Sequence, residues 1–341
     1  MKHFMKPLQN NQTKIKLLYT AAGLLFVLSM LLGLLLGSTS LSLRDLWNAI
    51  FESDSVSPES AIFRFVRLPR TCASLICGAA LAVSGAIIQG VLANRLASPG
   101  IVGVNSGAGL AVTLCGVFGV LGGWRLSLFA FLGAFLSVLL IALGAKKWGA
   151  SRGTVILMGV AMNSLLGAVS DAIVTFFPTM GIMRNDFRVG DFSFVTSETL
   201  IPATIAILIT LAIVFTLANE LDVLSLGEET AKGLGLNTGK ARLLFLLFAA
   251  ILAGAAVSLA GLLSFIGLLV PHAVRRLGAG ASRHLLPLCA LFGAGFVTLS
   301  DVLARVLFAP YEIPVGIIMA FVGAPFFVFL LVKGKGGHRN A

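Results

Sequence analysis

The chain of 341 residues is 57% hydrophobic and only 11% charged. A water-soluble fold of this length cannot bury that much apolar surface, so the composition excludes a soluble globular protein and indicates an integral membrane protein. The formal net charge of +11 does not indicate a nucleic-acid partner, because the basic residues of membrane proteins gather on cytoplasmic loops.

Apolar runs long enough to cross a membrane recur along the whole chain. A transmembrane helix needs about 20 apolar residues, and such runs lie at residues 17–37, 71–93, 100–123, 128–145, 153–177, 200–219, 243–274, 285–308 and 313–332. These runs are too long and too uniformly apolar for the strands of a β-barrel, which alternate over about ten residues. The first run is about twice the length of a signal-peptide core, and no Ala-x-Ala site follows it. We therefore interpret it as a helix too.

The lysines predict the topology, because positive charge gathers on the cytoplasmic side. They precede the first run (Lys2, Lys6, Lys14, Lys16), follow the fourth (Lys146, Lys147), follow the sixth (Lys232, Lys240) and follow the last (Lys333, Lys335). With the N-terminus inside, nine crossings would place the last group of lysines outside. Ten crossings place it inside, so one of the nine runs should cross twice. The run 243–274 is the candidate, since it is too long for one span and contains Gly261 and Ser264. We expect two short helices there, joined by a tight external turn.

The fold class predicted from these runs is an all-α integral membrane protein with about ten transmembrane helices. The membrane domain covers residues 17–333, and residues 1–16 and 334–341 are cytoplasmic tails. The segments "GAALAVSG" at 78–85 and "GAAVSLAG" at 254–261 share one pattern on helices of opposite direction. They favour an inverted repeat of two five-helix halves, although Gly and Ala are frequent enough in membrane helices for the match to arise by chance.

The sequence offers little for catalysis or for metal binding. The cysteines lie within apolar runs without metal-ligand spacing, so we interpret them as small hydrophobic residues. For His272, a structural or helix-ending role is favoured over metal ligation. "GLNTGKA" at 235–241 departs from a phosphate-binding loop in its spacing and in its last residue. We therefore predict no catalytic residue, no resident metal or cofactor, and no nucleotide site in this chain.

Polar residues inside the membrane each need a reason, because they are costly there. Asp301 and Arg305 are four residues apart and can pair on one helix face. For Gln89, Asn163 and Asp171, structural hydrogen bonding is favoured over contact with a substrate in a cavity.

Arginines gather where positive charge is normally avoided. "RFVRLPR" places Arg64, Arg67 and Arg70 on the outer side, just before the second helix, whose start Pro69 suits. Such arginines need acidic partners, and a docking protein or anionic lipid would supply them.

The segment "LDVLSLGEETAKGLGLNTGKARL" at 221–243 differs from its membrane-length neighbours. Its apolar residues fit a short amphipathic helix or a pair of helices, interrupted by glycines, with Glu228, Glu229 and Lys232 exposed. A solvated loop is the alternative. A structured surface there would serve as a contact for a separate soluble partner.

Several motifs in this order resemble one family. They are "RLPR" with "GAALAVSGAIIQ", "NRLASPGIVGVNSGAG", "LSLGEETAKGLGL", "SFIGLLVPHAVRRLGAG", "LSDVLARV", "EIPVGI" and "GAPFFVFLL". Together they resemble the permease subunits of ABC importers for iron-siderophores, haem and vitamin B12, the FecCD type, from about Leu41 to Lys333. The family usually has Asn-Pro-Leu-Ala where this chain has Asn94, Arg95, Leu96 and Ala97.

The resemblance implies a bacterial inner-membrane protein with both termini in the cytoplasm. It implies two permease subunits, identical or related, around a central pathway that works by alternating access, with two ATPase subunits that bind ATP and Mg, and a substrate-binding protein outside. The residues that match the ATPase-coupling segment at 221–240 are Gly227, Glu228, Ala231, Gly233 and Gly235. Those that match binding-protein docking positions are Arg67, Arg70 and Arg305, and those that match the cytoplasmic gate are Asn94 and Leu96. A ferric siderophore is the expected substrate, and haem and cobalamin remain open.

Two other classes stay open on the residues alone. A secondary transporter with inverted repeats would be driven by an ion gradient. Such proteins usually bind the coupling ion at the midplane with carboxylates or with the carbonyls of broken helices, and the eligible carboxylates here are Asp171 and Asp301. A scaffold or receptor that transports nothing would leave the gate-like loop unexplained.

Overall fold

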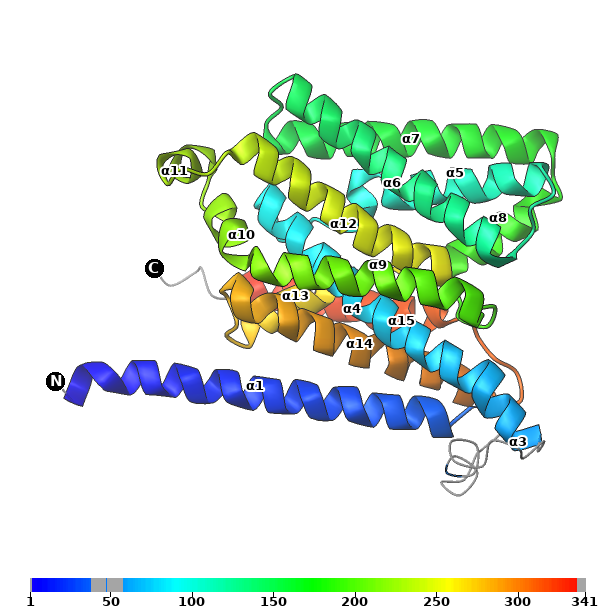
Figure 1. Ribbon diagram of the computed structural model, residues 1–341, viewed down its shortest axis with the longest axis horizontal. Coiled ribbons are helices and arrows are strands. Elements are labelled where there is room, and N and C mark those ends of the chain that lie inside the picture. The colour runs from blue at the N-terminus through cyan, green and yellow to red at the C-terminus, as the bar shows by residue number, and fades with distance from the viewer. Residues whose placement is uncertain (1, 38–46, 48–57, 336–341) are drawn as a thin grey trace.

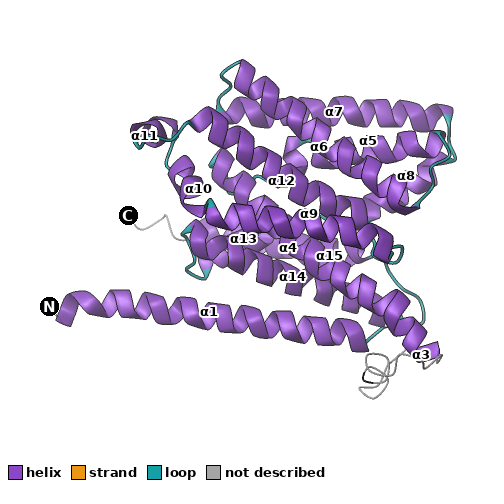
Figure 2. Ribbon diagram, in the orientation of Figure 1, coloured by secondary structure: helices purple, strands orange, loops and turns teal. Residues whose placement is uncertain are grey.

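The computed structural model describes residues 2–37, 47 and 58–335, and this part of the chain is helical without a strand (Figure 2). Four long helices dominate the first half: α1 (Lys2–Leu35), α4 (Leu68–Leu92), α6 (Gly123–Lys147) and α7 (Arg152–Phe176). A turn of 3-10 helix, η2 (Pro99–Val102), and the shorter α5 (Val104–Val117) connect α4 to α6. The prediction of an all-α fold is confirmed.

The second half holds five membrane-associated helices and several short ones. The former are α9 (Ser197–Thr216), α12 (Thr238–Ala260), α13 (Ile266–Arg276), α14 (Ser282–Val306) and α15 (Val315–Lys335). The short helices are α8 (Met180–Val189), α10 (Ala218–Ser225) and α11 (Glu228–Gly233). In Figure 1, α10 and α11 lie at the end of the molecule where α1 begins, and α3 (Pro58–Ala61) lies at the opposite end.

Within the described residues, 7 helices are long and apolar enough to span a membrane, and α5 and α15 follow as shorter apolar helices. The run 243–274 divides as predicted into α12 and α13, although α12 has 23 residues and only α13, with 11, is short. Gly261 causes the break: its φ is +68°, and a Cβ there would lie 2.5 Å from the Phe187 carbonyl oxygen. If α13 is counted as a membrane helix, the helices of the described chain agree with the predicted number of about ten.

Two predicted boundaries were wrong for backbone reasons. The second helix begins at Pro58 and passes through a π-helical segment, η1 (Ile62–Arg67), so Pro69 does not start it and the arginines of "RFVRLPR" lie on the helix. Within the run 100–123, the α-helix extends only from Val104 to Val117, because Gly103, with a φ of +88°, separates it from the 3-10 turn η2. His272 does not end its helix, since α13 continues to Arg276.

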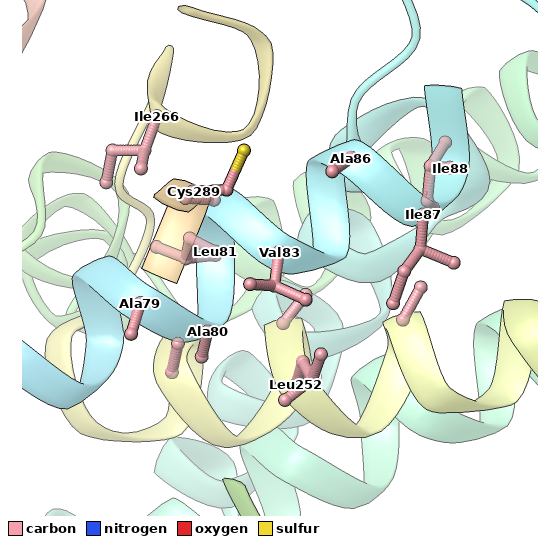
Figure 3. Close-up of a cluster of buried hydrophobic side chains, with 14 of the residues drawn as sticks. Ala79, Ala80, Leu81, Val83, Ala86, Ile87, Ile88, Leu252, Ile266 and Cys289 are labelled. Carbon is pink, nitrogen blue, oxygen red and sulfur yellow. The ribbon is translucent and has the colours of Figure 1, made fainter. Parts of the chain in front are cut away.

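Helix α4 is the centre of the packed core. It packs against α14, α12 and α13, and most of its residues are buried. Figure 3 shows the alanines and larger apolar residues of α4 next to Leu252 of α12, Ile266 of α13 and Cys289 of α14. As predicted for small hydrophobic residues, Cys77, Cys115 and Cys289 are buried thiols.

Glycine pairs set the closest approaches between helices. A Cβ on Gly78 would collide with the Gly293 carbonyl of α14, and a Cβ on Gly85 would collide with the backbone of Gly267 in α13. Small residues permit such approaches where apolar helices pack without a hydrophobic driving force from water. Helix α4 packs on α14 while α12 packs on α6, which agrees with the predicted inverted repeat; the repeat itself stays a prediction.

Candidate functional site

Helix α10 is fixed to the membrane helices by an apolar face and by one carboxylate. Leu221 and Leu224, three residues apart, are buried, and Leu221 packs over Gly90 of α4. Asp222 accepts hydrogen bonds from the backbone N and the Oγ of Ser282, at 3.0 and 2.6 Å. The carboxylate therefore caps the first turn of α14, where unpaired N–H groups and the helix dipole favour negative charge.

Helix α11 is a single short turn between two glycines with positive φ. Gly227 (φ +121°) precedes it, and Gly235 (φ +83°) follows it. Gly235 N donates to Lys232 O, and Leu236 N donates to Ala231 O at 3.0 Å, which is the Schellman pattern of a left-handed C-terminus. Ala231 is the buried residue of this helix. The prediction of a pair of helices in the segment 221–243 is confirmed.

Glu228 connects α11 to the helix that follows. Its carboxylate lies 3.0 Å from Lys232 Nζ and 3.0 Å from Arg242 Nη2 of α12. Hydrogen bonds from Lys232 and Arg242 hold the pKa of Glu228 below its usual range. Arg242 in turn donates to the Ala150 carbonyl, and Arg152 donates to the Leu224 carbonyl at 2.5 Å. A movement of α10 or α11 is thereby linked to α7 and α12.

The outward surface of α10 and α11 is apolar as well as charged. Leu226 and Leu234, expected on the apolar face of the segment, are instead 62% and 63% exposed. Glu228, Glu229 and Lys232 are exposed as predicted. Gly227, Gly233 and Gly235 have open space where a side chain would be.

The loop after α4 brings the predicted gate residues to the same turn. Ala93 has a φ of +46°, and Asn94 N donates to Gln89 O, which closes α4. Asn94 Oδ1 accepts from Leu96 N at 2.9 Å, so Asn94 holds the turn while Leu96 is 49% exposed. The role of Asn94 and Leu96 in gating stays a prediction.

Gln89 joins this loop to α13. Its Nε2 donates to the Gly267 carbonyl at 3.1 Å, and its Oε1 accepts from Arg275 Nη1. The predicted structural hydrogen bonding of Gln89 is confirmed. Asp171 likewise has a helix partner, since Arg184 Nη1 lies 2.5 Å from Asp171 Oδ1.

The three arginines predicted to dock a binding protein lie at the opposite end, and all are buried within the chain: Arg67 is 3% exposed, Arg70 4% and Arg305 2%. Arg70 Nε donates to Asp301 Oδ1 at 3.0 Å, and Arg305 Nε lies 3.1 Å from Asp301 Oδ2. The predicted Asp301–Arg305 pair is confirmed. For Arg70, the expectation that acidic groups of a docking protein or of anionic lipid would be its partner was wrong, because Asp301 of the same chain pairs with it.

Further groups complete the shell around Arg70. Its Nη1 donates to Glu312 Oε2 at 2.6 Å and to Ser193 Oγ at 3.3 Å, and its Nη2 lies 3.6 Å from Asp191. Four segments therefore meet at one guanidinium: α4, α14, the α8–α9 loop and the α14–α15 loop. Glu312 was not predicted as a partner of these arginines, although the motif "EIPVGI" contains it.

A cavity of about 410 Å³ lies among α5, α7, α8 and the η2 turn. Asn163 of α7, predicted to form structural hydrogen bonds, spans its base: Nδ2 donates to Gly100 O at 2.9 Å, and Oδ1 accepts from Ser106 Oγ at 2.6 Å. Arg184 and Arg188 line the cavity from α8. Among the described residues, no group of three or more His, Cys, Asp or Glu side chains is arranged to hold a metal ion.

Residues 25–333 match the model of the FecCD transport family. This chain belongs to that family. FecCD relatives of similar length include the Fe(3+)-citrate import system permease protein YfmD of Bacillus subtilis (strain 168), which is 38% identical over 94% of this chain and 95% of its own. The hemin transport system permease protein HmuU of Yersinia pestis is 38% identical over 92% and 95% of the two chains. The vitamin B12 import system permease protein BtuC of Yersinia enterocolitica is 35% identical over 98% of each.

A solved structure supports the same assignment. An inward-facing conformation of a metal-chelate type ABC transporter superposes with a TM-score of 0.81 at 30% identity, over 93% of this chain and 99% of that one. As a FecCD member, this chain is an ABC importer permease and a multi-pass membrane protein.

Proposed function

We propose that this chain imports an iron chelate, with a ferric siderophore as the first candidate and haem or cobalamin as alternatives. Two copies, or one copy and a related subunit, enclose the pathway, and the substrate passes inward by alternating access. ATP hydrolysis takes place on two separate ATPase subunits. The membrane is the inner membrane of a bacterium, with both termini in the cytoplasm.

The observation that carries this proposal is the surface of α10 and α11. Leu226 and Leu234, which flank α11, expose apolar side chains, and Glu229 of α11 is exposed too. Exposed apolar residues together with charged ones are typical of a protein contact. The network through Glu228, Arg242 and Arg152 links this surface to α12 and α7. A soluble ATPase that grips α10 and α11 would thus move membrane helices.

The binding protein is expected at the opposite end, around Arg67, Arg70 and Arg305. These side chains are buried, so docking there requires acidic groups of the partner to enter the cluster or to exchange with Glu312. The alternative of an ion-gradient carrier has less support, because the two eligible carboxylates, Asp171 and Asp301, are already paired with arginines.

The test compares two aspartate substitutions at the same end of the molecule. Leu234→Asp on the α11 surface should abolish co-purification of the ATPase and ATP-dependent uptake of radioactive iron. Leu277→Asp, 53% exposed in the turn between α13 and α14, is the matched control and should retain both. Full ATPase recovery and full uptake with Leu234→Asp would refute the coupling role.

A further inference from the structure

The cavity among α5, α7, α8 and η2 has the size and lining of a ligand site. Its volume of about 410 Å³ falls within the range of small-molecule sites, about 300 to 1,000 Å³. Its polar lining includes Asn105, Ser106, Asn163, Ser170, Arg184 and Arg188. Polar side chains in a membrane domain are costly and commonly mark a substrate path.

Most of the polar lining is already hydrogen-bonded within the chain. Ser106 and Asn163 bond to each other, and Ser170 Oγ donates to the Leu166 carbonyl at 2.8 Å. Asn105 differs, because its side chain forms no hydrogen bond with the described part of the chain. Its amide is therefore open to a ligand.

The cavity carries a net positive charge. Arg184 and Arg188 are four residues apart on α8 and share one helix face. Arg184 is paired with Asp171, whereas Arg188 is exposed and forms no ion pair with any described residue. The nearby acids Asp171 and Asp186 do not line the cavity. One solvated guanidinium on the cavity wall is thus available to a ligand.

Two glycines keep the cavity open. Gly109 of α5 and Gly167 of α7 line it, and a Cβ on either would meet nothing within 4 Å. Neither glycine has a positive φ, so the backbone conformation does not require glycine at either position. The lack of a side chain at both positions leaves space in the cavity.

We propose that this cavity is a subsite for an anionic iron(III) chelate, whose peripheral carboxylates bind Arg188 and Arg184 while Asn105 donates a further hydrogen bond. The inference rests on the proposed transport function and narrows its substrate class. Arg suits carboxylates because its planar guanidinium donates two parallel hydrogen bonds. An uncharged chelate would form no ion pair with Arg188.

The test measures equilibrium binding of ⁵⁵Fe(III) citrate to the full chain in complex with its ATPase, in nanodiscs of uncharged phosphatidylcholine. These discs remove anionic lipid as a competing occupant. Wild type should bind saturably. Arg188→Gln should weaken binding about tenfold, and Arg188→Lys should weaken it about threefold or less, because a cation is kept. Binding of a neutral ferric trihydroxamate should not respond to Arg188→Gln.

A second variant tests the cavity without altering charge. Gly167→Leu should fill the space and abolish binding, whereas Gly23→Leu, at a position on α1 that is equally open, should leave it unchanged. Wild-type affinity in both Arg188→Gln and Gly167→Leu, or absence of saturable citrate binding by wild type, would overturn the subsite. ATPase activity of the same complex is measured in parallel: failure of the complex to form or to hydrolyse ATP refutes the proposed function, whereas an active complex without citrate binding refutes only the subsite.

Discussion

Arg70 and Asp301, 231 residues apart in the sequence, form a buried hydrogen-bonded ion pair, with Arg70 Nε 3.0 Å from Asp301 Oδ1. Asp301 is fully buried and also pairs with Arg305. One carboxylate therefore pairs with two arginines at the junction of α4 and α14. Removing one partner of a buried pair leaves an uncompensated charge, which is costly.

Asp301→Asn should destabilise the protein by about 3 to 5 kcal/mol, because it leaves Arg70 and Arg305 without their shared carboxylate. Thermal unfolding in detergent measures the effect. Asp171→Asn is the control: the Asp171 side chain is 67% exposed, so its loss should cost at most about 1 kcal/mol. Equal unfolding temperatures for the two variants would contradict the assignment of the buried cluster as a stabilising centre.

Glu228 gives the attachment of α11 a defined pH dependence. The pKa of Glu228 is lower in the folded state than in the unfolded state. Its ion pairs therefore stabilise α11 fully above the unfolded-state pKa, and this stabilisation is lost as the pH falls through the folded-state pKa. Because the unperturbed pKa of Glu is about 4.3, we expect the protection of residues 228–233 from hydrogen exchange, measured relative to the intrinsic rate at each pH, to be high at neutral pH and to fall only at more acidic pH. Glu228→Gln should remove this acid transition, and an unchanged pH profile in that variant would assign the transition to another group.

The glycine contact between α4 and α13 should be intolerant of a single methyl group. Gly85→Ala would place a Cβ against the Gly267 backbone, and overpacking of this kind costs about 1 to 3 kcal/mol or more. Gly109→Ala, with open space at its Cβ, should be neutral or stabilising by up to about 1 kcal/mol. Folded yield and unfolding temperature are measured for both variants. A Gly85→Ala variant as stable as wild type would contradict the close contact between α4 and α13.

Asp222 should control the order of α10. Asp222→Ala removes the acceptor for Ser282 N and Oγ, and the loss of such a cap costs about 0.5 to 2 kcal/mol. Hydrogen exchange should increase in residues 218–225 and in the first turn of α14. Asp222→Asn retains an acceptor oxygen and should show a smaller increase, so a larger effect of Asn than of Ala would contradict capping.

The helical fold was predictable because hydrophobic length is a local property of the sequence. The division of residues 243–274 into two helices followed from length, glycines and the lysine distribution, and the structure confirms it with α12 and α13. That both helices cross the membrane stays a prediction. By contrast, the start of α5 depends on the positive φ of Gly103, which apolar composition does not reveal. Helix α8 was also missed, because it lies between two apolar runs and is itself amphipathic.

The candidate site was less predictable than the fold. The Asp301–Arg305 pair could be predicted from the sequence, because residues four apart on a helix share a face. The partners Arg70 and Asp301 are brought together only by the packing of α4 on α14, so no spacing rule could pair them. The arginines at 184 and 188 have the same four-residue spacing, and that signal could have pointed to α8 as a functional helix.

The glycine pair at 78 and 293 also restricts how the sequence can evolve. A Cβ at either position would meet the backbone carbonyl of the other, and a carbonyl oxygen belongs to every amino acid. A side-chain clash in a core can be rescued by a smaller residue at the neighbouring position, but here no smaller residue exists. Substitution of one glycine therefore has no compensating substitution at its partner, and each of the two positions is constrained independently of the other.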